Sequence, residues 1–165
     1  MRTKVKISQA DLATFKHEFF NLSEVQLIYK PSFKVSGRPK MTCSIDLYNL
    51  LTTVWDEDRI QYVEQFYIIL LNKASSVIGI SPVSLGGITG TVADPKIIFT
   101  TALLAGASAI VLAHNHPSGN LKPSGADIEL TNKVVAAGKL LDIHVLDHII
   151  MTGHGFTSFA DESWI

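Results

Sequence analysis

Two histidines and one aspartate in the second half of the chain have the residue types and the spacing of a metal site. His114 and His116 lie two positions apart, directly after the apolar run 109–113. Residues two apart in an extended chain project to the same side, so both imidazoles can face one point. If Asp127 returned to that point, three protein ligands would leave a fourth tetrahedral position for water, as in catalytic zinc sites.

The segment between these residues can bring the carboxylate back. Pro117 prevents simple continuation of the strand, and Gly119 permits a turn. Ser124 is then a good helix N-cap, which places Asp127 in the first turn of the helix that follows. Taken alone, Asp127 has a simpler explanation, because carboxylates are favoured near helix N-termini. Two histidines at the mouth of a very apolar strand are harder to explain as packing, since buried imidazoles need partners.

The hydrophobic pattern around these residues predicts several strands. Nearly continuous apolar runs are typical of strands that are buried on both faces. The chain offers four such runs and one shorter run near its end, at residues 65–71, 77–83, 109–113, 144–151 and 157–159. Turn residues between the first two runs predict a hairpin.

Three helices are predicted among these strands. Ser44 is predicted to cap a helix over 45–55, which ends at the acidic turn 56–58. Asp94-Pro95 pairs an N-cap with proline at the first helical position, and this helix is expected to reach about residue 107. The helix capped by Ser124 is expected to reach about residue 141. The sum is an α/β (α+β) fold, with a mixed sheet flanked by helices.

The amino-terminal 40 residues differ from the remainder in charge. They carry eight Lys/Arg and three Asp/Glu, a net charge of +5, whereas residues 41–165 carry six and twelve, a net charge of −6. A short helix at 11–20, a strand at 25–29 and a loop at 31–40 are expected here. We therefore predict a basic arm, residues 1–40, and a domain, residues 41–165, with its core in 63–165.

Composition limits the class of protein. The chain is 47% hydrophobic and 18% charged, which is typical of a globular domain. Its single cysteine, Cys43, excludes an internal disulfide and fits a reducing compartment. It also excludes a deaminase-type zinc site, which needs a cysteine pair. The longest apolar run, 102–113, is shorter than the ~20 residues that cross a bilayer. We expect a cytoplasmic protein with no membrane segment.

The residues of the metal pattern carry a resemblance to a known family. The signature of JAMM (MPN+) metalloproteases is His-x-His-Pro, six residues, and then Ser-x-x-Asp. The chain matches it at every position, with His114, His116, Pro117, Ser124 and Asp127. Five identities at fixed spacing make this match highly specific.

The wider sequence resembles one branch of that family. His-Asn-His-Pro-Ser-Gly at 114–119, followed by Leu-Asp-His at 146–148, is similar to the RadC-like (UPF0758) proteins, and the similarity covers roughly residues 63–165. The resemblance implies the JAMM, cytidine-deaminase-like architecture. It also implies one Zn²⁺ per chain, held by His114, His116 and Asp127.

The resemblance also assigns catalytic roles. The family has a glutamate that opens an earlier core strand, and Glu64 fits that position; the acidic residues at 56–58 compete by composition but fall in a turn. Such a carboxylate can take a proton from a metal-activated water and deliver it to the leaving amine. Ser124, beyond its capping role, would help stabilise the oxyanion. His148 is interpreted as a residue that supports a ligand rather than as a ligand itself.

The implied activity is zinc-dependent hydrolysis of an amide in a peptide or isopeptide-like substrate, by a metallopeptidase mechanism. Two alternatives belong to other classes. One is a nucleic-acid-binding accessory protein of DNA repair, which only the basic arm supports. The other is a non-catalytic MPN-type interaction module, which the retained ligand types disfavour. The sequence selects neither a substrate nor an oligomeric state.

Overall fold

The computed structural model describes residues 37–87 and 90–165. The predicted helix at 11–20 and strand at 25–29 lie outside the described residues, as does most of the predicted loop at 31–40. The division into an arm and a domain therefore stays a prediction.

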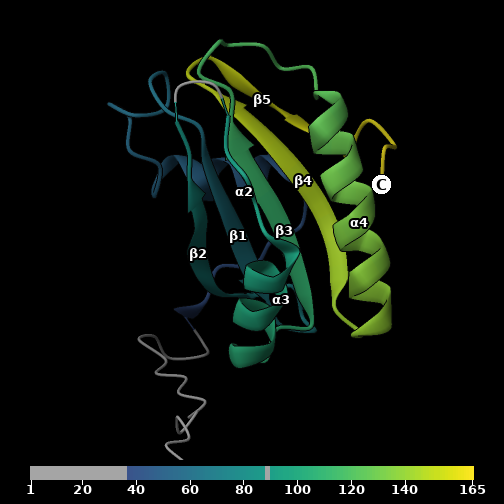
Figure 1. The fold of residues 1–165 in the computed structure, drawn as a ribbon. Helices are drawn as coiled ribbons and strands as arrows, with labels where there is room; N and C mark the ends of the chain where they lie inside the picture. The colour runs from purple at the N-terminus through teal and green to yellow at the C-terminus, as the bar shows by residue number, and fades with distance from the viewer. Residues whose placement is uncertain (1–36, 88–89) are drawn as a thin grey trace, which may run out of the picture.

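A mixed five-stranded sheet forms the centre of the fold. Its strands are arranged in the order β2-β1-β3-β4-β5 (Figure 1). Their bounds are Gln65–Leu71 for β1, Val77–Leu85 for β2, Ala109–Asn115 for β3, His144–Thr152 for β4 and Gly155–Ser158 for β5. Only β3 and β4 run parallel, and the other neighbouring pairs are antiparallel. The predicted mixed α/β fold is thus confirmed.

Helices cover both faces of this sheet (Figure 1). Helix α2 spans Ser44–Thr52 and packs on one face, whereas α3, Pro95–Leu104, and α4, Gly125–Leu140, pack on the other. Helix α4 connects the parallel strands β3 and β4, as such a pair requires a crossover. Among the described residues, no helix combines the length and apolar character needed to span a bilayer.

The central strand β3 is buried along its whole length, which explains its unbroken apolar sequence. Its side chains alternate between two cores. Ile110 and Leu112 pack with α3 and α4, whereas Val111 and Ala113 pack with α2. His114 and Asn115 continue this alternation, so the two polar residues at the end of β3 leave the strand on opposite faces.

The helix starts agree with the sequence in two of three cases. Asp94 accepts a hydrogen bond from the Lys96 backbone N–H at 2.9 Å, and Ser124 caps α4 as predicted. The prediction that Ser44 caps the first helix was wrong. Cys43 occupies the N-cap without a side-chain cap, and the Ser44 hydroxyl donates to Asp161 at 2.6 Å.

That helix is also shorter than predicted, ending at Thr52 rather than near residue 55. The hydroxyl groups of Thr52 and Thr53 donate to the carbonyl oxygens of Asn49 and Leu50 at 2.8 and 2.7 Å. These bonds satisfy carbonyls at the end of the helix, where intrahelical partners are missing. Trp55 still reaches the core from the turn that follows, with 5% of its surface exposed.

The packing of α4 on the chain that leads into β4 depends on Gly138. A Cβ atom at this position would overlap the carbonyl oxygen of Ile143. Gly138 is buried within α4, so the helix could accommodate a side chain here only by moving away. Since α4 also carries Asp127, this close approach contributes to the placement of the candidate site.

Candidate metal centre

Strand β3 positions both histidines at one end of the sheet. His114 is the penultimate residue of β3 and is 1% exposed. His116 lies just beyond the strand, where its backbone N–H donates to the carbonyl of Met151 at 2.9 Å. This bond keeps the chain extended past the last paired residue. The two imidazoles therefore face one point, with their Nε2 atoms 3.0 Å apart.

The loop after His116 orients its imidazole and reverses the chain. Nδ1 of His116 lies 2.6 Å from the carbonyl oxygen of Asn120. A carbonyl can only accept, so Nδ1 carries a proton and Nε2 is directed toward His114. Gly119 makes the turn with a φ of 77°, in the region that favours glycine. The loop then ends at Ser124, the N-cap of α4.

A capping box places the third candidate ligand. The backbone N–H of Asp127 donates to the Ser124 hydroxyl at 3.2 Å, and the backbone N–H of Ser124 donates to the Asp127 carboxylate at 2.6 Å. The same carboxylate faces both histidines. Its oxygens lie 3.2 Å from Nε2 of His114 and 3.5 Å from Nε2 of His116.

These three donors fit a single ion. All three candidate ligand atoms lie within 4.8 Å of one another, and the cluster could bind a metal ion. Ligands about 2.0–2.1 Å from a tetrahedral zinc stand about 3.3 Å from each other. The distances of 3.0, 3.2 and 3.5 Å cluster around that value. Imidazole nitrogen and carboxylate oxygen are also donors that zinc accepts.

The electrostatics of the metal-free cluster favour an ionised carboxylate. Burial alone would raise the pKa of Asp127, but its interactions with His114 and His116 outweigh burial and hold that pKa far below the ordinary 3.8. In turn, the hydrogen bond with Asp127 raises the pKa of His116 above 6.5 despite its burial. Asp127 is therefore held in the ionised form that a metal ligand needs, and a proton on Nε2 of His116 would have to leave when a metal ion binds.

A third histidine, His148 of β4, lies behind this cluster in the interior. Its Nε2 lies 2.8 Å from Nδ1 of His114, on the side of that ring away from Asp127. Its Nδ1 lies 2.7 Å from the hydroxyl of Thr131, one turn after Asp127 on α4. His148 has no exposed surface, and this burial holds its pKa well below 6.5. His148 thus lies one hydrogen bond behind His114, and its supporting role stays a prediction.

Asn115, between the two candidate ligands, was not singled out from the sequence. Its side chain leaves β3 on the opposite face from His114 and is completely buried. The amide oxygen accepts from the backbone N–H of Gln65 at 2.7 Å, and the amide nitrogen donates to the carbonyls of Ile60 and Val63 at 2.7 and 2.9 Å. These bonds tie the segment that carries Glu64 to the strand that carries the histidines.

Glu64 lines the open side of the site. A cavity of about 300 Å³ beside His116 is bounded by Glu64, the loop after His116, and Ser124. The negative charge of Glu64 also contributes to the raised pKa of His116. The competing acidic turn at 56–58 contributes nothing to this cavity, and its Asp56 pairs with Arg59 at 3.2 Å.

Ser124 lines the same cavity. Its hydroxyl oxygen accepts the capping hydrogen bond from Asp127. Within the part of the chain that the structure describes, its hydroxyl proton has no acceptor. It is therefore available to donate to an oxygen atom of a molecule bound in the cavity.

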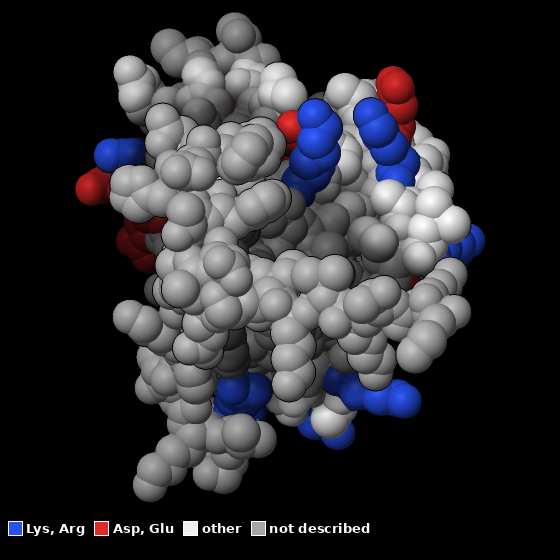
Figure 2. All heavy atoms as spheres, turned by 60° about the horizontal axis from the view of Figure 1, so that its bottom comes forward, with Lys and Arg blue, Asp and Glu red and all other residues white. Residues whose placement is uncertain are grey.

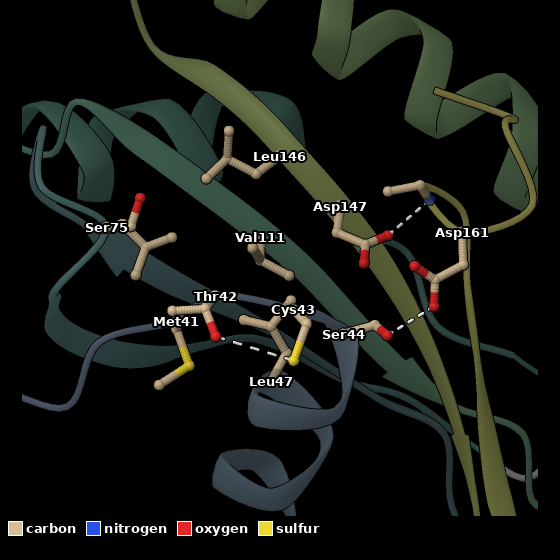
Figure 3. Close-up of a pocket in the computed structure, with 12 residues that line it drawn as sticks. Met41, Thr42, Cys43, Ser44, Leu47, Ser75, Val111, Leu146, Asp147 and Asp161 are labelled. Carbon is tan, nitrogen blue, oxygen red and sulfur yellow. Dashed lines mark hydrogen bonds between the residues drawn. The ribbon is translucent and has the colours of Figure 1, made fainter.

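Asp147, the middle residue of the Leu-Asp-His pattern, lies outside the candidate metal centre, and its contacts hold the fold together. It lines a second cavity, of about 320 Å³, to which Cys43 at the start of α2 also contributes. Figure 3 shows Asp147 on the β4 side of this cavity. Its carboxylate, 3% exposed, accepts from the Ser158 hydroxyl at 2.6 Å and from the backbone N–H groups of Ala160 and His148 at 3.0 and 2.7 Å. It joins β4 to the turn after β5.

The described surface gives little support for nucleic-acid binding. Residues 37–165 carry eight Lys/Arg and twelve Asp/Glu, a net charge of −4. On the face that Figure 2 shows, the described basic side chains stand in separate small groups, and acidic side chains lie beside several of them. No continuous basic surface forms on this face among the described residues.

Comparison with known proteins places this geometry in a family. The family model of the RadC-like JAB domain matches residues 41–164. The chain belongs to the RadC-like JAB domain family. The match covers all of the candidate ligands, together with Glu64, Ser124 and His148.

Several curated relatives carry the name UPF0758 protein. The chain is 40% identical to the protein of Flavobacterium johnsoniae over 123 residues, which are 74% of this chain and 52% of the relative. It is 44% identical to the protein of Symbiobacterium thermophilum over 99 residues, which are 60% of this chain and 42% of that relative. Identity to the Methanosarcina mazei protein is 32% over 134 residues, which are 81% of this chain and 57% of that relative. The chain spans about half the length of these relatives.

Proposed function

We propose that this RadC-like JAB domain is a zinc-dependent hydrolase that cleaves an amide bond of a peptide or isopeptide-like substrate. The observation that carries the proposal is the convergence of three donors, from the end of β3, the residue just beyond it and the first turn of α4, at distances that suit one ion. The donors meet beside a cavity that a substrate could enter. Membership of the chain in the RadC-like JAB domain family adds support, because JAB domains include metallohydrolases.

The chain's own residues would divide the work as follows. His114, His116 and Asp127 hold the ion, which when bound supplies Lewis-acid activation of water and of a substrate carbonyl. Glu64, on the cavity wall, accepts the proton of the attacking water and returns it to the leaving amine. Ser124 donates its uncommitted hydroxyl proton to the oxygen on which negative charge develops.

Metal content and hydrolysis test the proposal separately. The unaltered chain should bind one zinc ion, and His116→Ala should reduce the bound zinc to trace levels. His154→Ala changes an exposed histidine outside the cluster and should bind zinc normally. Elemental analysis after gel filtration measures this directly. If the unaltered chain bound no stoichiometric zinc, the proposal would be wrong.

The catalytic step requires a substrate screen, since no single substrate is selected by the site. Peptide and isopeptide libraries, read by mass spectrometry, provide one. Glu64→Gln should keep its zinc but lose about 10²–10⁴-fold in rate, the usual contribution of a general base. Cleavage at an unchanged rate by this variant would refute the role of Glu64.

The two alternatives from the sequence stay as predictions. Nucleic-acid binding rests on the basic residues 1–40, most of which lie outside the described part of the chain. Salt-sensitive DNA binding that disappears when residues 1–40 are deleted would support it. A non-catalytic interaction module would be indicated by zinc binding without hydrolysis of any library member.

A further inference from the structure

We propose that Thr131 is a positioning residue of the metal centre. Acting through His148, its hydroxyl fixes the proton of His114 on Nδ1 and so keeps Nε2 available as a ligand. This inference deepens the proposed function, because it rests on metal binding by His114, His116 and Asp127. Neither the family pattern nor the sequence analysis pointed to Thr131.

The first link commits the proton of the Thr131 hydroxyl. Thr131 lies four residues after Asp127 on the same face of α4, and its Oγ1 lies 2.6 Å from the backbone carbonyl oxygen of Asp127. A carbonyl can only accept, so the hydroxyl donates to it. Oγ1 must then act as the acceptor toward its other neighbour, Nδ1 of His148, at 2.7 Å.

The second link sets the tautomer of His148. The ring has no exposed surface, and it packs against the rings of Phe66 and Phe159 with centroids 5.6 and 4.7 Å away. A charged imidazole is costly in such surroundings, so the ring stays neutral and carries one proton. Since Nδ1 donates to Thr131, that proton is on Nδ1, and Nε2 is an acceptor.

The third link reaches the candidate ligand. Nδ1 of His114 lies 2.8 Å from Nε2 of His148, which can only accept. Nδ1 of His114 therefore donates, and its Nε2 is left to face Asp127 and His116. The chain of hydrogen bonds begins at the carbonyl of Asp127 and ends beside its carboxylate. One residue thus anchors both the ligand set and the network that orients it.

Loss of the Thr131 hydroxyl removes the group that gives this network its direction. Nδ1 of His148 would lose its acceptor in a site without exposed surface, which makes the opposite tautomer competitive. His148 would then donate from Nε2 to Nδ1 of His114. A neutral His114 would carry its single proton on Nε2, where it blocks the metal.

The experiment compares three threonine variants of the full chain. Thr131→Val keeps the shape and removes the hydroxyl, whereas Thr131→Ser keeps the hydroxyl. Thr101→Val is a matched control, because the Thr101 hydroxyl also donates to a helix carbonyl, that of Ile97 at 2.8 Å, but on α3. Zinc affinity is measured by competition with a chromophoric chelator. Loss of a group that orients a ligand typically weakens metal binding about 10–100-fold.

We expect that loss for Thr131→Val only, with the other two variants close to the unaltered protein. Equal zinc affinity for Thr131→Val would overturn the inference. Imidazole ¹⁵N chemical shifts of the unaltered chain give a second, independent readout. They should show His148 neutral and protonated on Nδ1, and a proton on Nε2 instead would overturn the inference even if a variant failed to fold.

The two proposals can fail separately. If the unaltered chain bound no zinc but His148 carried its proton on Nδ1, the metal centre would be refuted and the hydrogen-bond network retained. If zinc bound but Thr131→Val bound it equally well, only the role of Thr131 would be lost.

Discussion

The amide of Asn115 provides the sharpest test of how the site is held together. Asn115→Ala removes three hydrogen bonds, to the N–H of Gln65 and to the carbonyls of Ile60 and Val63, at 2.7–2.9 Å. The side chain is completely buried, so the three backbone groups that it leaves behind have no direct access to bulk solvent. At a net value of about 1 kcal/mol per bond, we expect the free energy of unfolding to fall by about 3 kcal/mol.

Urea denaturation of the metal-free protein measures this loss. With a slope of about 1–3 kcal/mol per molar, a loss of about 3 kcal/mol lowers the midpoint by about 1–3 M. Asn49→Ala is the matched control, because Asn49 lies exposed on α2; its midpoint should stay nearly unchanged. Hydrogen exchange of the Gln65 amide should also accelerate in Asn115→Ala, since its acceptor is removed.

A small effect would contradict this account. If Asn115→Ala lost less than about 0.5 kcal/mol, the range of ordinary surface substitutions, the three bonds would not hold the segment before β1 in place. Asn115→Asp separates the contributions. It keeps the acceptor for Gln65 but sets a carboxylate against two carbonyl oxygens, so we expect it to be at least as destabilising as the alanine variant.

Three further predictions concern packing, the buried carboxylate and pH. Gly138→Ala should destabilise by about 1–3 kcal/mol in thermal unfolding, whereas Gly125→Ala, with open space around its Cβ, should be neutral or slightly stabilising. Asp147→Ala should cost about 2–4 kcal/mol in urea because three donors, two of them in buried hydrogen bonds, lose their acceptor, and Asp147→Asn should cost less. For the metal-free protein, the lowered pKa of Asp127 contributes stability above pH 3.8, and this contribution is lost as pH falls. The raised pKa of His116 contributes stability below pH 6.5, and this contribution is lost as pH rises through the pKa of His116 in the folded protein. Asp127→Asn should flatten both arms of that profile, and an unchanged profile would contradict the ion pair.

Much of the fold followed from hydrophobic patterning. The strands at 65–71 and 144–151 were found almost to the residue, because strands buried on both faces leave an unbroken apolar run. Side-chain capping was less reliable. Ser44 has the right type for an N-cap, but its hydroxyl bonds to Asp161, far away in the sequence. No local pattern could reveal that partner.

The candidate site was predictable where spacing dictated geometry. His114 and His116 share a strand end, and Asp127 follows a cap, so their convergence could be expected from local structure. Asn115 and Thr131 were missed because their partners come from distant elements. A signal for Asn115 did exist, since a polar residue at the end of a fully apolar strand must find hydrogen bonds somewhere. The sequence signal for Thr131 was weaker and consisted only of its position four residues after Asp127.

The capping box at the start of α4 has a consequence for how an ion would enter. Because the backbone N–H of Ser124 already restrains the Asp127 carboxylate, the rotamer entropy of that side chain is lost when the domain folds rather than when the ion arrives. The empty and loaded forms should therefore superimpose closely around α4. Metal uptake should accordingly be fast, limited by dehydration of the ion rather than by movement of the protein.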